Sequence, residues 1–202
     1  MSELIDHLAE LTGFRDRDIL DVTLAAAFRD LLQPRSVAIY RVVGDGEQRR
    51  WLTRARLGED DAVATADSAW VDLDNLPGLA QHPARCDALA GQTVVAQHGA
   101  IGVAVFPLAT DREVVAVLEI TTDGALGAEA QRLVCSVLRI YRNFVGLLED
   151  SERDTLTGLL NRKTFDESFL KISAALPPRA AAAADGRRQA GAGRRWWLGM
   201  ID

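Results

Sequence analysis

Residues 101–121 read IGVAVFPLATDREVVAVLEIT and hold two apolar runs on either side of a short polar segment. The runs cover residues 101–108 and 113–121, and Thr110-Asp111-Arg112 separates them. Apolar side chains stand at both odd and even positions of the second run, so a strand there would be covered on both faces. The pattern predicts an antiparallel hairpin whose second strand is buried.

Two further strands are expected on either side of the turn Gly44-Asp45-Gly46. In residues 36–43, one face would carry Val37, Ile39 and Val43, and the other Ala38, Tyr40 and Val42. In residues 50–57, we expect one face to carry Trp51, Thr53, Ala55 and Leu57, and the opposite, solvated face to carry Arg50, Arg54 and Arg56. Residues 69–73 and 93–97 are short apolar runs that also favour strands.

Helical patterns surround these strands. Residues 4–33 carry apolar side chains at three-to-four spacing, with Gly13 as a break and Pro34 as the stop. Residues 76–90 favour a helical segment that prolines interrupt, and a long final helix begins near residue 129. This order of elements predicts an α+β fold with the helices on one side of an antiparallel sheet.

Composition limits the classes of protein to which the chain can belong. With 202 residues, 48% of them hydrophobic, it is expected to be one globular domain with an appended fragment. The net charge of -6 argues against a nucleic-acid partner. Cys86 and Cys135 lack the spacing of a redox or metal motif, which favours a reduced, cytoplasmic setting. No apolar stretch reaches the roughly 18 to 20 residues of a membrane span, so no membrane partner is expected.

Two segments resemble the GAF sensory fold: residues 76–94, LPGLAQHPARCDALAGQTV, and Phe106-Pro107-Leu108 followed by the strand at 114–120. The resemblance implies a GAF-like antiparallel sheet flanked by helices over residues 1–128, with room for a small-molecule ligand. The ligand and the residues that would bind it stay unknown. The cyclic-nucleotide signature N-K-x-F-x-D-E is absent, and Cys86 is followed by Asp87 rather than by the histidine typical of bilin attachment.

Residues 154–165, DTLTGLLNRKTF, resemble the opening D-x-L-T-G-L-x-N-R-x-x-F of a GGDEF domain, the catalytic domain of diguanylate cyclases. The matching residues are Asp154, Leu156, Thr157, Gly158, Leu159, Asn161, Arg162 and Phe165. The resemblance implies a structural and regulatory role for them. We expect Asn161 to cap a helix that starts at Arg162, Asp154 to pair with Arg162, and Phe165 to lie in the core.

Residues 196–202, WWLGMID, resemble the family's buried strand that ends in a metal-binding aspartate. Asp202 is therefore a candidate Mg²⁺ ligand in an intact domain only, where Mg²⁺ and GTP are implied. The Gly-Gly-(Asp/Glu)-Glu-Phe hairpin is absent from the sequence. We therefore expect no catalytic residue, no cofactor and no activity in this chain, which we interpret as a piece cut from a longer protein. Residues 179–195 are interpreted as a low-complexity linker.

The long final helix carries an apolar seam, which consists of Leu133, Val137, Ile140, Phe144 and Leu147. The spacing of 4, 3, 4, 3 is the a/d pattern of a left-handed coiled coil, so it predicts a homodimer. The alternative is that the helix packs on its own sheet. A second row, Leu138, Tyr141, Val145 and Leu148, suggests that one stripe faces the sheet and the other faces a partner.

These observations divide the chain into a GAF-like regulatory domain (1–128), a signalling helix (129–153) and the start of a GGDEF domain (154–202). The hypothesis is the sensory and dimerisation portion of a diguanylate cyclase, which would make cyclic di-GMP from two GTP. The alternative is a ligand-free GAF-fold dimerisation scaffold. An apolar cavity beside residues 76–91 would favour the sensor, and a solid core there would favour the scaffold. Cys135 is expected to be a packed, inert thiol, and His82 to be a surface or capping residue.

Overall fold

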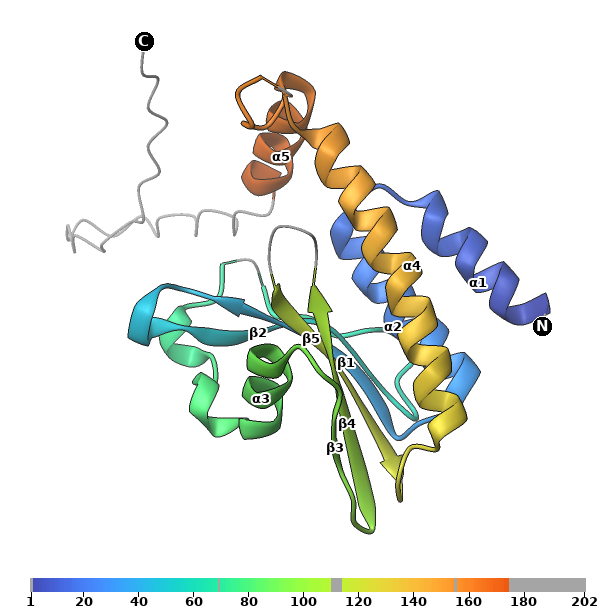
Figure 1. Ribbon diagram of the computed structural model, residues 1–202. Helices are drawn as coiled ribbons and strands as arrows, with labels where there is room; N and C mark the ends of the chain where they lie inside the picture. Colours follow the sequence, from blue (N-terminus) through green and yellow to red (C-terminus); the bar gives the residue numbers. More distant parts are fainter. Residues whose placement is uncertain (1, 69, 110–113, 155, 175–202) are drawn as a thin grey trace, which may run out of the picture.

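One five-stranded antiparallel sheet forms the centre of the computed structural model, which describes residues 2–68, 70–109, 114–154 and 156–174 (Figure 1). The strands are β1 (Ser36–Val43), β2 (Arg50–Gly58), β3 (Val95–Gln97), β4 (Ile101–Ala109) and β5 (Val114–Asp123). Their order across the sheet is β2-β1-β5-β4-β3. The predicted α+β class is confirmed, and so is the hairpin, in which β4 and β5 pair with Phe106 opposite Leu118.

Helices cover both faces of the sheet. On one face lie α2 (Arg17–Leu32) and α4 (Ala128–Glu152), with α1 (Ser2–Gly13) packed on these two helices, and on the other lies α3 (Pro83–Gly91) (Figure 1). The prediction of helices on one side only is therefore wrong. The reason is visible in β1, where Val37 packs with the three-helix face and Ala38 packs with α3. An apolar strand on both faces needs a cover on both.

The remaining elements are short or lie at the end of the long helix. Helix α5 (Arg162–Ala174) follows α4 after a tight turn, and three 3-10 helices occupy loops. These are η1 (Gly46–Gln48), η2 (Leu73–Asn75) and η3 (Leu79–Gln81). Instead of the strand predicted at residues 69–73, the described residues there lead into η2. The Asp72 carboxylate accepts a hydrogen bond from the Asp74 amide, which starts a helical turn rather than a strand.

A β-bulge in β2 changes which side chains share a face. Ile39 of β1 lies opposite Ala55, but the next residue, Tyr40, lies opposite Thr53, so Arg54 is an extra residue in β2. One extra residue reverses the alternation of side chains along a strand.

The reversal corrects the predicted faces of β2. Trp51 is fully buried on the α3 side of the sheet, whereas Ala55 and Leu57 are buried on the three-helix face. The prediction that these residues share one face is therefore wrong, and so is the prediction that Arg54 is solvated. The bulge directs Arg54 toward α2, where its guanidinium pairs with Asp18 and Asp21.

A buried polar network joins α2, α4 and β2. The Tyr141 hydroxyl donates a 2.6 Å hydrogen bond to Asp21 Oδ1, and Arg54 Nε donates a 3.0 Å bond to Asp21 Oδ2. Asp21 is only 7% exposed. Burial, and then the neighbouring Asp21 carboxylate, raise the pKa of Tyr141 well above its usual value. The hydroxyl therefore stays a donor, and α4 is fixed against α2.

A second pair of contacts holds the last turns of α4. Arg17, at the start of α2, donates to Glu149 at 3.1 Å and to Glu152 at 2.9 Å.

Within the described part of the chain, none of the helices is long and apolar enough to cross a membrane.

Gly102 is required where β4 passes the end of β5. A Cβ atom at this position would lie 1.9 Å from the Gly124 carbonyl oxygen. We expect Gly102→Ala to lower the free energy of unfolding by about 3 kcal/mol, because the backbone must shift. Gly127→Ala is the control, since a Cβ there meets no atom within 4 Å. Urea unfolding measures both, and equal loss in the two variants would contradict the prediction.

Tyr141→Phe should lower the free energy of unfolding near neutral pH by about 2 kcal/mol, because a hydrogen bond to a carboxylate is lost. The folded pKa of Tyr141 is raised above its unfolded value of about 10. Its contribution is therefore complete below that pH and is lost as the pH rises through the folded pKa. Urea unfolding should show a constant difference between the two proteins from about pH 8 to about pH 10 and a shrinking difference above that pH, whereas a difference that stays constant above about pH 10 would refute this linkage.

Candidate functional site

Two regions are candidates for function. The first is the packed space between α3 and the sheet, which we call the α3 face. The second is the turn between α4 and α5, residues 151–164, which we call the junction. The α3 face is where a GAF-like ligand was expected, and the junction contains most of the residues that resemble a GGDEF opening.

A buried guanidinium occupies the α3 face. Pro83 begins α3, and Arg85 in its first turn is only 5% exposed. Arg85 Nε donates to Glu119 Oε2 at 2.7 Å and Nη2 donates to Oε1 at 3.0 Å, so the pair is bidentate. The guanidinium carbon lies 3.4 Å from the centroid of the Tyr40 ring and 5.8 Å from that of Trp51. These contacts tie α3 to β5, β1 and β2.

Sequence reasoning missed the Arg85–Glu119 pair. Glu119 is the one charged residue between 114 and 121 in an otherwise apolar run. A lone acid in a strand that is covered on both faces needs a cationic partner, because an unpaired buried charge is costly. That signal could have identified Glu119, although it could not have named Arg85.

The side chains around this pair are neutral donors. Trp51 Nε1 and the Cys86 thiol both donate to the Leu79 carbonyl, at 3.4 and 3.2 Å. Burial, followed by the charge of Asp87, raises the pKa of Cys86. Burial and the charge of Arg85 lower the pKa of His82, which precedes α3 without forming a side-chain cap.

Described side chains of the α3 face, among them Tyr40, Trp51 and Ala88, pack against one another. Three hollows are described: one between α4 and β4, one beside the junction and one beside η2. Among the described residues, no group of three or more His, Cys, Asp or Glu is placed to hold a metal ion. Asp202, the candidate Mg²⁺ ligand, lies outside the described residues, as do the strand and linker predicted before it.

The first part of the junction is a turn closed by Asp154. Its carboxylate accepts hydrogen bonds from the Thr157 amide and hydroxyl, both at 2.9 Å, and from the Leu156 amide at 3.2 Å. These bonds, those from Thr157 first, lower the pKa of Asp154. Gly158 follows with a φ of 70°, which favours glycine. The predicted pairing of Asp154 with Arg162 is wrong, because the turn itself occupies the carboxylate.

The second part of the junction is a clamp formed by Asn161. Its Oδ1 accepts from the Thr164 amide at 2.9 Å, which confirms the predicted helix cap. Its side-chain Nδ2 donates to the Ser151 carbonyl at 2.7 Å, and its backbone N–H donates to the Glu152 carbonyl at 2.8 Å. One residue therefore begins α5 and binds it to the last turn of α4.

The apolar residues of this segment are exposed. Leu156 is 93% exposed and Leu159 is 69% exposed. The prediction that Phe165 lies in a core is wrong for the described chain, because it is 44% exposed and stacks on Phe169.

The predicted seam of α4 is divided between the core and the surface. Val137 is buried in the chain's own core, and Leu133 and Phe144 pack against that core. Ile140 and Leu147 are exposed, at 38% and 68%. The second row, Leu138, Tyr141, Val145 and Leu148, packs inward as predicted. Cys135, expected to be packed, is exposed instead.

The described fold is similar to solved structures of low sequence identity. The GAF domain of an Acinetobacter phosphoenolpyruvate-protein phosphotransferase is 11% identical with a TM-score of 0.53, over 72% of this chain and 92% of that one. A GAF sensor protein from Burkholderia vietnamiensis, described as putative, is 13% identical with a TM-score of 0.51, over 74% and 90%.

An enzyme shares the same likeness. The free methionine-R-sulfoxide reductase from Neisseria meningitidis, solved in complex with its substrate, is 13% identical with a TM-score of 0.52, over 73% of this chain and 88% of that one. No protein-family model matches the chain, and no curated protein matches it either. At such identities the likeness speaks for architecture alone: the chain has the GAF fold.

Proposed function

We propose that this chain is the regulatory portion of a diguanylate cyclase that acts in the cytoplasm. Residues 1–128 form its GAF sensory domain, residues 129–153 its signalling helix, and residues 154–202 the start of a GGDEF domain. In the intact enzyme, two such domains would each bring one GTP, with Mg²⁺ bound by Asp202, and join the two nucleotides as cyclic di-GMP. The chain alone, without the Gly-Gly-(Asp/Glu)-Glu-Phe hairpin, would bind and transmit a signal but would not catalyse.

The geometry of the junction carries this proposal. Three of the residues that resemble the GGDEF opening connect the two helices: Asp154 closes the turn, Gly158 supplies the positive φ, and Asn161 clamps α5 to α4. None of them is arranged for chemistry. A clamped turn of this kind makes α5 follow any displacement of α4, which is what an output helix requires.

The exposed part of the seam supports dimerisation. Ile140 and Leu147 lie two helical turns apart on one stripe of α4, and both are exposed. A second copy packed on this stripe would bury both residues and would place two junctions side by side. Two GGDEF domains that leave adjacent junctions could then face each other with their nucleotides.

The second candidate is the ligand-free dimerisation scaffold. In it, the buried Arg85–Glu119 pair would belong to a core that holds no sensed molecule. The reductase, which has the same fold, was solved in complex with its substrate. The sensor proposal assumes that this chain also binds a small molecule. Native mass spectrometry separates the two, because a carried ligand adds mass to the 22.0 kDa chain.

The Arg85–Glu119 pair should be costly to break and inexpensive to replace. Arg85→Met alone should lower the free energy of unfolding by about 3 kcal/mol, since it leaves Glu119 without its partner. The double variant Arg85→Met/Glu119→Leu should recover most of that loss, because no buried charge remains. Urea unfolding of Arg85→Met, of Glu119→Leu and of the double variant gives the interaction free energy between the two side chains. Additive losses of stability would show that the two side chains act separately.

A chimera tests the enzymatic proposal. Residues 1–161 would precede the remainder of an active GGDEF domain, joined within its D-x-L-T-G-L-x-N-R sequence. With GTP and Mg²⁺ the chimera should form cyclic di-GMP, and the chain itself should form none. Leu147→Asp should make the chimera monomeric and lower product formation roughly tenfold or more, because a charge enters the exposed seam. Light scattering and chromatography of the product measure both effects.

Val63→Asp is the matched control, since Val63 is 76% exposed and belongs to the loop after β2 rather than to α4. It makes the same apolar-to-acid change and should leave both mass and activity unaltered. Product formed by the chain itself would refute the inactive-fragment proposal. A Leu147→Asp chimera that is monomeric and fully active would refute regulation through the seam.

A further inference from the structure

A hollow of about 420 Å³ lies between α4 and β4, on the sheet face opposite α3. Its floor is apolar and consists of Phe106, Pro107, Leu108 and Leu138. Its volume falls within the roughly 300–1,000 Å³ that is typical of small-molecule sites. The hollow is separate from the α3 face and from the junction.

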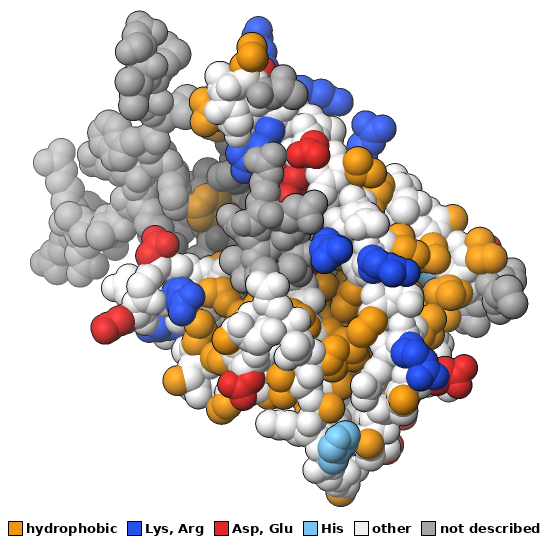
Figure 2. Space-filling model, viewed as in Figure 1, with side chains coloured by type: hydrophobic (Ala, Val, Ile, Leu, Met, Phe, Trp, Pro, Cys, Tyr) orange, Lys and Arg blue, Asp and Glu red, His pale blue; other side chains and the backbone are white. Residues whose placement is uncertain are grey.

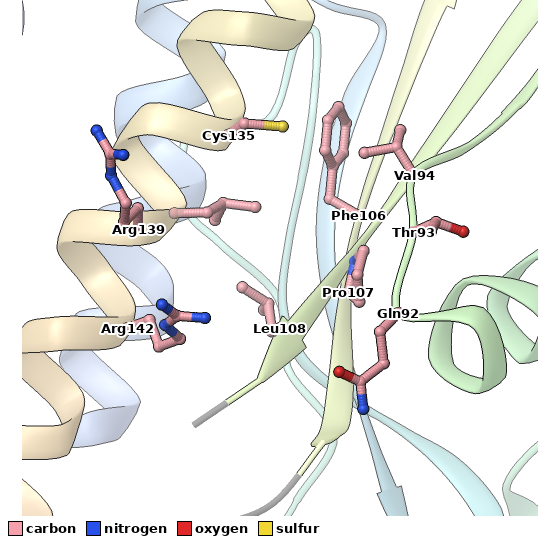
Figure 3. A pocket seen from close by; sticks show the side chains of 10 residues that line it. Gln92, Thr93, Val94, Phe106, Pro107, Leu108, Cys135, Arg139 and Arg142 are labelled. Carbon is pink, nitrogen blue, oxygen red and sulfur yellow. The ribbon is translucent and has the colours of Figure 1, made fainter. Parts of the chain in front are cut away.

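The end of strand pairing creates this hollow. Strand β3 pairs with β4 only from Val95 opposite Val105 to Gln97 opposite Val103. Residues 92–94 leave β4 beyond that point, so within the described residues no further strand lies beside this edge of β4 from Phe106 onward. Pro107 fits such an edge, because it has no amide hydrogen to donate. The gap between residues 92–94 and α4 is the hollow (Figure 3).

Two arginines give the hollow a positive rim. Cys135, Arg139 and Arg142 form one stripe of α4, at intervals of four and three residues, and all three line the hollow. In Figure 3, Arg142 extends from α4 toward the strand, Arg139 runs along the helix, and the Cys135 thiol points toward Phe106. Figure 2 shows hydrophobic side chains between α4 and the strands, bordered by Lys and Arg side chains along the helix.

Among the described residues, no carboxylate balances these arginines. None of the described residues that line the hollow is acidic, and within the same ranges neither Arg139 nor Arg142 has an ion pair. The chain as a whole has a net charge of -6, so two unpaired arginines beside one apolar floor run against its general charge.

We infer that this hollow binds a small amphiphilic carboxylate. The apolar tail packs on Phe106, Leu108 and Leu138, and the carboxylate accepts hydrogen bonds from Arg142 and, after rotation of its side chain, from Arg139. A guanidinium presents a planar fork that matches a carboxylate, and desolvation beside an apolar floor strengthens such bonds. The occupant contacts α4 directly, so this site is an input to the helix that is independent of the α3 face.

Cys135 provides a local reporter of occupancy. The Cys86→Ser variant leaves Cys135 as the single thiol and retains a hydroxyl to donate to Leu79. Its reaction with the uncharged reagent 4,4′-dithiodipyridine is followed by absorbance, with decanoate added below its micelle concentration. We expect saturating decanoate to slow the reaction roughly tenfold, and decanol at equal concentration to slow it less than about twofold.

Two double variants, made in the same Cys86→Ser background, locate the effect. Arg139→Gln/Arg142→Gln should abolish the protection by decanoate, with each rate compared with and without ligand in the same variant. Arg49→Gln/Arg132→Gln removes the same charge from exposed arginines outside the hollow and should retain the protection. Equal protection by decanol, or protection that survives Arg139→Gln/Arg142→Gln, would overturn the inference.

Calorimetry of the unaltered chain is the second measurement. Decanoate should bind saturably, and Arg139→Gln/Arg142→Gln should weaken this binding roughly tenfold. No heat of binding at two temperatures, with decanoate in excess, would overturn the inference whatever the thiol kinetics show. Neither experiment involves GTP or dimerisation, so the inference and the proposed function can fail independently.

Discussion

The arrangement of the three-helix face depends on one buried carboxylate, that of Asp21. It accepts from Tyr141 of α4 on one oxygen and from Arg54 of β2 on the other, and it stands on α2. A charge that is 7% exposed is tolerated only because both oxygens have donors. The positions of α2, of α4 and of the bulge at Arg54 therefore depend on one another. A change in any one of them would leave the buried Asp21 carboxylate without a donor.

The opposite face follows the same rule with the roles exchanged. Here a helix supplies the cation, Arg85, and a strand supplies the carboxylate of Glu119. Replacing such pairs by apolar residues often leaves stability unchanged, so their value lies in fixing one arrangement among several. Each face thus combines apolar area, which stabilises the fold without direction, with one ion pair that sets where a helix lies on the sheet.

The sequence predicted the elements that depend on local pattern. The β4–β5 hairpin, the break at Gly13 and the cap at Asn161 follow from residues close together in the chain. The bulge at Arg54 was not predictable, because a single extra residue reverses the faces of β2 without altering its composition. The Arg85–Glu119 pair joins residues 34 positions apart, and the exposure of Cys135 depends on where β3 stops pairing. Neither feature can be predicted from the hydrophobic periodicity of a single segment.

Helix α4 carries three stripes with different surroundings. One is buried against the sheet through Leu138, Val145 and Leu148; a second, with Arg139 and Arg142, borders the hollow; Ile140 and Leu147 form the third, at the surface. Because all three belong to one rigid helix, rotation about its axis changes every stripe at once. The Tyr141–Asp21 bond opposes such rotation unless α2 moves with it. In the proposed function, an input that displaces α4 must therefore move α2 and α4 as one unit, and the clamp at Asn161 passes that movement on to α5.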